Sequence, residues 1–201
     1  MRHVLVSIFV LVLTATTWTQ EKPRTQLPRG QISDLGRPTE KSDEAPLFDY
    51  DIYFPGKWNF EWRVPESPLG ASGTIRGTET FTPSEDGHYY TSIIEAEGPD
   101  GPFTVTSTIA YEKQRKVFAR YDKDSRGFEM FRTGPIGGDL GGFYTIHYES
   151  APFEANGHTV RLKTKKRMVS PLNFKIEAAI SVDGGPYMNY GSPWWQKEFK
   201  R

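Results

Sequence analysis

The stretch Phe103-Thr104-Val105-Thr106-Ser107-Thr108-Ile109-Ala110-Tyr111 carries the clearest structural signal in the chain. Aromatic, aliphatic and small residues occupy the odd positions, and threonine or alanine occupies the even ones. Because successive side chains of a β-strand point to opposite faces, this alternation predicts a strand with one buried and one solvent face. The same alternation recurs at 143–150 and 173–182. The sequence therefore predicts an all-β protein.

Further segments of this kind follow one another from Leu47 onward, separated by turn residues at intervals of about eight to fifteen residues. Turns such as Asn156-Gly157 and Asp183-Gly184-Gly185 are suited to hairpins. Sequential hairpins predict an antiparallel up-and-down meander, and about eight to ten strands hide their edges by closing into a barrel. The predicted strands span 57–64, 73–82, 88–97, 103–111, 116–121, 127–133, 143–150, 158–168, 173–182 and 187–199.

The composition excludes several classes of function. The chain has 201 residues, with 25 Lys and Arg against 25 Asp and Glu, and no cysteine. The lack of cysteine excludes disulfides, thiolate metal sites and a cysteine nucleophile. The balanced charge argues against a nucleic-acid partner, which usually requires a strongly basic face.

The N-terminal part has a different character from the rest. Residues 1–20 combine a positive start, an apolar run at 4–13 and a polar end, which is the pattern of a secretory signal peptide; an uncleaved anchor is the alternative. Residues 21–46 are rich in proline and mixed charges and predict a flexible linker. Residues 47–201 then form a single β-barrel domain. We expect a secreted or bacterial periplasmic protein with no transmembrane segment after signal removal.

A short motif at the start of the first strand suggests a family. Gly56-Lys57-Trp58 follows an aromatic lead-in from Phe48 to Phe54, and a glycine-rich second strand begins at Gly73. This pattern resembles the opening of lipocalin-like (calycin) barrels, and the body is similar to an uncharacterised family of exported bacterial calycin-like proteins. The resemblance implies that Trp58 closes one end of the barrel against a basic residue of the last strand, for which Lys197, Lys200 and Arg201 are candidates. Calycins include binders of small molecules and a few enzymes.

The apolar faces of the strands predict a candidate ligand site. A closed barrel with a tyrosine-rich interior is either fully packed or leaves room for a small apolar or amphipathic ligand. The predicted lining residues come from three strands: Phe103, Val105, Ile109, Tyr111, Tyr144, Ile146, Tyr148, Phe174 and Ile176.

No catalytic motif is present, and enzyme activity has no positive signal. There is no G-x-S-x-G, and the histidines lack the spacing of a metal or haem site, so we predict no metal and no cofactor. An enzyme is the alternative function, and it would use a carboxylate with a Tyr or His as its acid–base pair. It requires Glu79, Glu95, Glu97 or His88 to be buried beside a cavity.

One strand is strongly basic. Arg161, Lys163, Lys165 and Arg167 share one face by their two-residue period. Two interpretations are open: contact with an anionic partner in an envelope-associated structural protein, or a solvated outer strand protected against edge pairing. The glycine-rich stretch 134–142 also has two interpretations: a plain connection between strands, or a lid over the barrel mouth.

Overall fold

The structure is a computed structural model, and it describes residues 53–86, 89–112, 115, 117–138 and 144–198. The predicted signal peptide and linker lie outside these residues. In the described part of the chain there is no helix long and apolar enough to cross a lipid bilayer.

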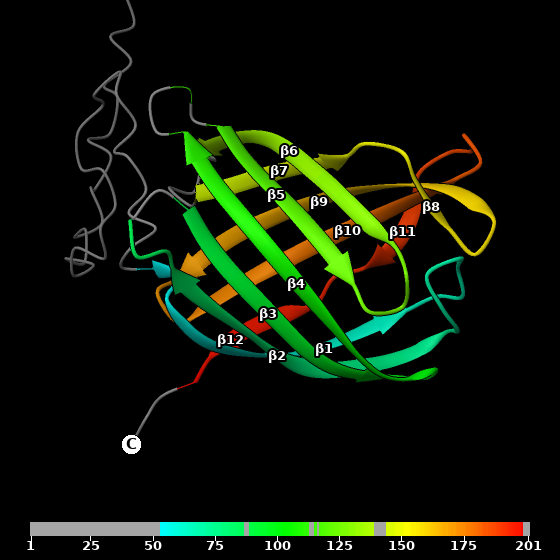
Figure 1. Cartoon of the computed structure of the whole chain (residues 1–201), viewed down its shortest axis with the longest axis horizontal. Coiled ribbons are helices and arrows are strands. Elements are labelled where there is room, and N and C mark those ends of the chain that lie inside the picture. The colour runs from blue at the N-terminus through cyan, green and yellow to red at the C-terminus, as the bar shows by residue number, and fades with distance from the viewer. Residues whose placement is uncertain (1–52, 87–88, 113–114, 116, 139–143, 199–201) are drawn as a thin grey trace, which may run out of the picture. The chain divides into compact units, whose positions relative to one another are not determined.

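Ten of the strands form a closed antiparallel barrel (Figure 1). Each of the first six strands pairs with the next, β7 pairs with β9, β9 with β10, and β10 with β12. Strand β12 then pairs with β1, with Trp58 opposite Lys197, and this pairing closes the ring. The strands are β1(Gly56–Val64), β2(Gly73–Pro83), β3(Tyr89–Gly98), β4(Gly101–Glu112), β5(Val117–Asp124), β6(Glu129–Gly138), β7(Tyr144–Ser150), β8(Phe153–Ala155), β9(His158–Ser170), β10(Asn173–Val182), β11(Met188–Gly191) and β12(Trp194–Lys197).

The prediction of an all-β antiparallel meander that closes with eight to ten strands is confirmed. Strands β8 and β11 lie outside the ring, paired with β9 and β10 respectively. The single strand predicted at 187–199 is wrong, because it is divided into β11 and β12. Pro193 lies between them and has no N–H to donate, while its carbonyl accepts a bond from Ile176 N at 3.0 Å.

Strands β5 and β6 are longer than the sequence predicted. Strand β5 continues to Asp124, and β6 continues through the glycine-rich stretch to Gly138. The backbone here requires glycine: a Cβ on Gly134 would lie 1.5 Å from the carbonyl oxygen of His147 on β7. Ile136 then points into the barrel and is buried. Residues 139–142 lie outside the described part of the chain.

Aromatic side chains close one end of the barrel. Trp58 is fully buried, and its indole N–H donates to Phe54 O at 3.0 Å. Its ring contacts Tyr53 and Phe174 at centroid distances of 5.7 and 4.8 Å. Lys197 Nζ lies 5.2 Å from the centre of the Trp58 ring and donates to Tyr53 O. Of the three basic residues considered as partners of Trp58, Lys197 therefore lies beside it, and Lys200 and Arg201 lie outside the described residues.

Candidate functional site

A layer of buried ions crosses the middle of the barrel. Arg120 on β5 donates from Nη1 to Glu79 Oε1 at 2.8 Å and from Nε to Asp122 Oδ1 at 2.6 Å. Arg132 on β6 donates from Nε and Nη2 to the other oxygen of Asp122, at 3.0 and 2.7 Å. The four side chains project inward from three strands and carry two positive and two negative charges.

Two serines complete this ion layer. Ser92 donates to Glu79 Oε1 at 3.0 Å, and Ser107 donates to Asp122 Oδ1 at 2.6 Å. Arg120 Nη2 in turn donates to both serine oxygens, at 3.3 and 2.7 Å. A buried ion pair is stable only when such additional bonds satisfy the remaining donors and acceptors. The layer is therefore neutral and internally bonded.

The ion layer fixes its own protonation state. Burial by itself would raise the pKa of Asp122, but Arg120 and Arg132 outweigh it and hold the pKa well below its usual range. Burial would likewise lower the pKa of Arg120, but Asp122 and Glu79 hold it above its usual range. The two charges stabilise each other, so neither group exchanges a proton near neutral pH.

Lys166 on β9 lies on the closed side of this layer without a carboxylate partner among the described residues. Its Nζ lies 3.9, 4.3 and 4.9 Å from the ring centres of Phe174, Phe54 and Phe81. Burial lowers the pKa of Lys166 to about 7, with nearby Glu79 opposing the shift. Near neutral pH, this amine is thus close to its titration midpoint.

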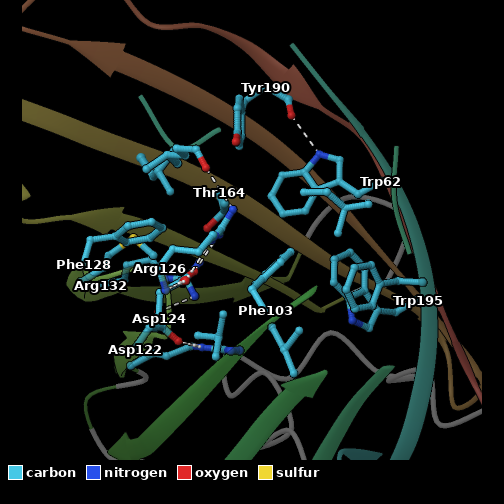
Figure 2. Close-up of a pocket in the computed structure, with 18 residues that line it drawn as sticks. Trp62, Phe103, Asp122, Asp124, Arg126, Phe128, Arg132, Thr164, Tyr190 and Trp195 are labelled. Carbon is cyan, nitrogen blue, oxygen red and sulfur yellow. Dashed lines mark hydrogen bonds and ion pairs between the residues drawn. The ribbon is translucent and has the colours of Figure 1, made fainter. Parts of the chain in front are cut away.

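A cavity of about 110 Å³ lies on the other side of the ion layer (Figure 2). Its walls are largely apolar, with aromatic and aliphatic side chains in equal number, and Arg120, Asp122 and Arg132 contribute polar groups to its lining. Every carboxylate and guanidinium in the ion layer is already bonded, so the remaining unoccupied surface is mainly apolar. The aromatic wall residues are Phe60, Trp62, Phe103, Phe128, Tyr190 and Trp195.

The outer end of the cavity is covered by a residue from the β5–β6 turn. Arg126 bonds to Asp124 through Nε and Nη2, at 2.9 and 2.7 Å, and donates from Nη1 to Leu69 O at 2.9 Å. Its guanidinium carbon lies 3.8 Å from the centre of the Phe103 ring. Figure 2 shows Arg126 and Asp124 beside Phe128, facing the tryptophans across the pocket.

A second space of about 70 Å³ adjoins this cover. It lies between the β1–β2 connection and the β3–β4 turn, and Gly70 and Asp100 contribute to its lining. It shares five lining residues with the larger cavity: Leu69, Ile75, Phe103, Arg126 and Tyr190. These shared side chains form the partition between the two spaces.

The structure places only part of the predicted lining at this cavity. Phe103 and Val105 line it. The other seven predicted residues are not among the lining residues of this cavity, and their role in ligand binding stays a prediction. The closed end is filled by aromatic packing, as between Phe118 and Tyr148 at 5.2 Å. Tyr148 also lines a separate, more open hollow of about 530 Å³ formed by residues of β6, β7, β9 and β10. The seven residues are Ile109, Tyr111, Tyr144, Ile146, Tyr148, Phe174 and Ile176.

The basic residues of β9 lie on the outer face of the barrel. Arg161 and Lys163 both contact Glu149, at 2.5 and 3.6 Å, and Lys163 also lies 4.2 Å from the ring centre of Tyr187. Lys165 and Arg167 continue the row, and Lys165 is in register with His147 on β7. A single carboxylate therefore neutralises part of the row.

The four residues considered for an enzyme differ in their placement. Glu95 and Glu97 are exposed on the outer face of β3, and His88 lies outside the described residues. Glu79 is buried, but it is bound to Arg120 and Ser92. Among the described residues, no group of three His, Asp or Glu side chains could hold a metal ion.

Sequence reasoning missed Arg120, Arg132, Lys166 and Arg126. The available signal was the two-residue period, because Phe118, Arg120 and Asp122 alternate along one strand and must share a face. Opposite charges at positions i and i+2 of an inward face predict a buried pair. The predicted strand 116–121 ended one residue before Asp122, and this boundary concealed the signal.

Comparison with one solved structure supports the barrel fold. Rv2717c from M. tuberculosis superposes with a TM-score of 0.62 at 12% identity, covering 78% of this chain and all of that one. A de novo designed fluorescence-activating β-barrel gives a TM-score of 0.43 at 15% identity, covering 76% of this chain and all of the design. No protein-family profile matches the chain, and no curated protein matches it in sequence. At this level of identity, the likeness to Rv2717c concerns the fold alone.

Proposed function

We propose that this protein is an exported binding protein that holds a small, largely apolar molecule inside the open half of the barrel. The cavity above the ion layer is the observation that supports this proposal. Aromatic walls supply the contact area, and the bonded ion layer forms a rigid floor. Export rests on the N-terminal signal pattern, and the relation to calycins rests on the Gly56-Lys57-Trp58 motif.

The size of the cavity limits the ligand. Drug-sized ligands occupy pockets of about 300–1,000 Å³, whereas a dry cavity of about 150 Å³ binds benzene. A cavity of about 110 Å³, with an adjoining space of about 70 Å³, therefore suits a ligand with one ring and a short substituent.

The proposal is tested by titrating the protein with 2-phenylethanol and following tryptophan fluorescence, since Trp62 and Trp195 line the cavity. Two neighbouring residues of β3 provide a matched pair of variants. Ile94 lines the cavity, whereas Ile93 is 49% exposed on the outer face. We expect Ile94→Phe to fill the cavity and abolish the fluorescence change, and Ile93→Phe to preserve it. Binding of 2-phenylethanol that survives Ile94→Phe in a folded variant would refute the proposal, as would a failure of every small aryl probe, neutral or charged, to bind.

A further inference from the structure

The guanidinium of Arg126 occupies a site with the chemistry of an organic-cation receptor. Its carbon lies 3.8 and 5.1 Å from the ring centres of Phe103 and Phe128. The carboxylate of Asp124 binds it through two oxygens, at 2.9 and 2.7 Å. Aromatic faces combined with a carboxylate are the groups by which proteins bind guanidinium and alkylammonium ligands.

The charges around this position favour a positive group. The Asp124 side chain is only 4% exposed, and its carboxylate accepts bonds from the Arg126 guanidinium and from the backbone N–H of Arg126 at 2.9 Å. A second carboxylate, that of Asp100, lies nearby, because Asp100 and Arg126 both approach Gly70. A Cβ built on Gly70 would lie 2.5 Å from Asp100 Oδ2 and 3.8 Å from Arg126 Nη1. Without Arg126, the mouth would therefore carry two negative charges, which would repel an anionic ligand and attract a cationic one.

Arg126 also lies where a ligand must pass or end. It is one of the five residues that separate the cavity from the adjoining space beside Gly70 and Asp100. Its side chain is 29% exposed and comes from a turn, so moving it would break its bonds to Asp124 and Leu69 O but none of the barrel's hydrogen-bond ladders. A ligand with its ring in the cavity would therefore place a short substituent at this position.

We propose that the ligand is an organic monocation of the arylalkylamine or arylalkylguanidine class. Its ring occupies the cavity, and its charged group takes the place of the Arg126 guanidinium between Phe103, Phe128 and Asp124. Arg126 is then the chain's own occupant of the site, and the ligand displaces it. This inference rests on the proposed function, because it names the ligand class of the same cavity.

The experiment compares three probes of similar size and different charge: 2-phenylethylammonium, 2-phenylethanol and phenylacetate. Affinities are measured by calorimetry on the full domain at low and moderate ionic strength. We expect the cation to bind at least about tenfold more tightly than the alcohol, and phenylacetate to bind weakest. Asp124→Asn should reduce the affinity for the cation and leave that for the alcohol within about twofold, because only the cation uses the carboxylate.

Replacement of Arg126 gives the decisive second test. If the ligand must displace this guanidinium, Arg126→Ala increases the affinity for 2-phenylethylammonium by about tenfold or more, because the competing cation is gone. Arg76→Ala, which removes an exposed arginine paired with Glu61, should leave the affinity unchanged. Arg126→Gln, which removes the charge and retains most of the side chain, serves as the test if the alanine variant does not fold.

The outcomes separate the two proposals. Equal or tighter binding of the alcohol overturns the cation inference and leaves the binding function intact. Weaker binding of the cation to folded Arg126→Ala overturns the displacement of Arg126. If no probe binds the unmodified protein or either Arg126 variant, the proposed function fails together with this inference.

Discussion

Replacement of Lys166 by methionine should stabilise the protein, and the gain should depend on pH in a defined way. Lys166 is buried among Phe54, Phe81 and Phe174, and the described residues offer its ammonium no carboxylate within bonding distance. Methionine has a similar length and suits an aromatic environment. The substitution therefore removes a charge and leaves no buried partner unpaired.

The magnitude follows from the pKa of Lys166. Burial lowers this pKa from 10.5 to about 7. The difference of 10.5 − 7 = 3.5 pH units, at about 1.36 kcal/mol per unit, corresponds to a cost of ~5 kcal/mol at or below pH 7. Attraction between a desolvated ammonium and aromatic rings recovers about 2 kcal/mol. We therefore expect Lys166→Met to raise the free energy of unfolding by about 3–5 kcal/mol at pH 7.

The sign of the pH dependence is determined by which state binds the proton. Between pH 7 and 10.5 the unfolded chain holds a proton on Lys166 that the folded chain has released, so the unmodified protein gains stability as pH rises. The advantage of Lys166→Met is therefore complete below pH 7 and declines by about 1.4 kcal/mol per pH unit above it. At pH 9 the advantage should have fallen by about 3 kcal/mol.

The assay is urea denaturation of both proteins at pH 6, 7, 8 and 9. Taking the difference between variant and unmodified protein at each pH cancels the titration of other groups that do not contact Lys166. Lys165→Met, which changes an outward-facing lysine on the same strand, is the control and should show no difference that depends on pH. A loss of stability in Lys166→Met that is constant from pH 6 to 9 would refute the reasoning, because it would mean that the ammonium is net stabilising.

Two further substitutions test the architecture. Arg120→Met leaves the carboxylates of Glu79 and Asp122 buried without their main partner, so we expect a loss of about 3–5 kcal/mol by urea denaturation; a loss below about 1 kcal/mol would contradict a tightly bonded ion layer. Gly134→Ala should cost about 3 kcal/mol or prevent folding, because its Cβ would collide with the adjacent strand. Gly137→Ala, where a Cβ meets nothing within 4 Å, should be tolerated, and equal melting temperatures for the two variants would argue against the close approach of β6 and β7.

The sequence predicted the barrel because its information is local. Alternation along 103–111 sets the inward face, and the hairpin turns set the antiparallel order of strands. The errors arose where tertiary contacts override local preference. Gly134 and Pro135 resemble a loop in sequence, but they continue β6 because the neighbouring backbone approaches so closely that a side chain at 134 would not fit.

The position of the cavity was not predictable from apolar alternation alone. The inward face of every strand appears continuous in sequence, so Phe103 and Tyr148 seem equally suited to line a cavity. Which half of the barrel is filled depends on side chains from several strands meeting at one level. The register between strands determines which side chains meet at the same height in the barrel. It brings Glu79 on β2 and Arg120 on β5 together, and the sequence alone does not give this register.

The ion layer explains why a ten-stranded barrel has one filled half and one half with a cavity. Barrel diameter grows with strand number, and about eight strands already enclose enough width for side chains to fill or for one small ligand. A ten-stranded barrel is wider, and long side chains span the extra width near its middle. Arg120 on β5 reaches Glu79 on β2, with 2.8 Å between Nη1 and Oε1. Below this span, Lys166 and the phenylalanines fill the space. Above it the apolar side chains leave a cavity of about 110 Å³ between them, so the layer that stabilises the closed half also forms the floor of the cavity in the open half.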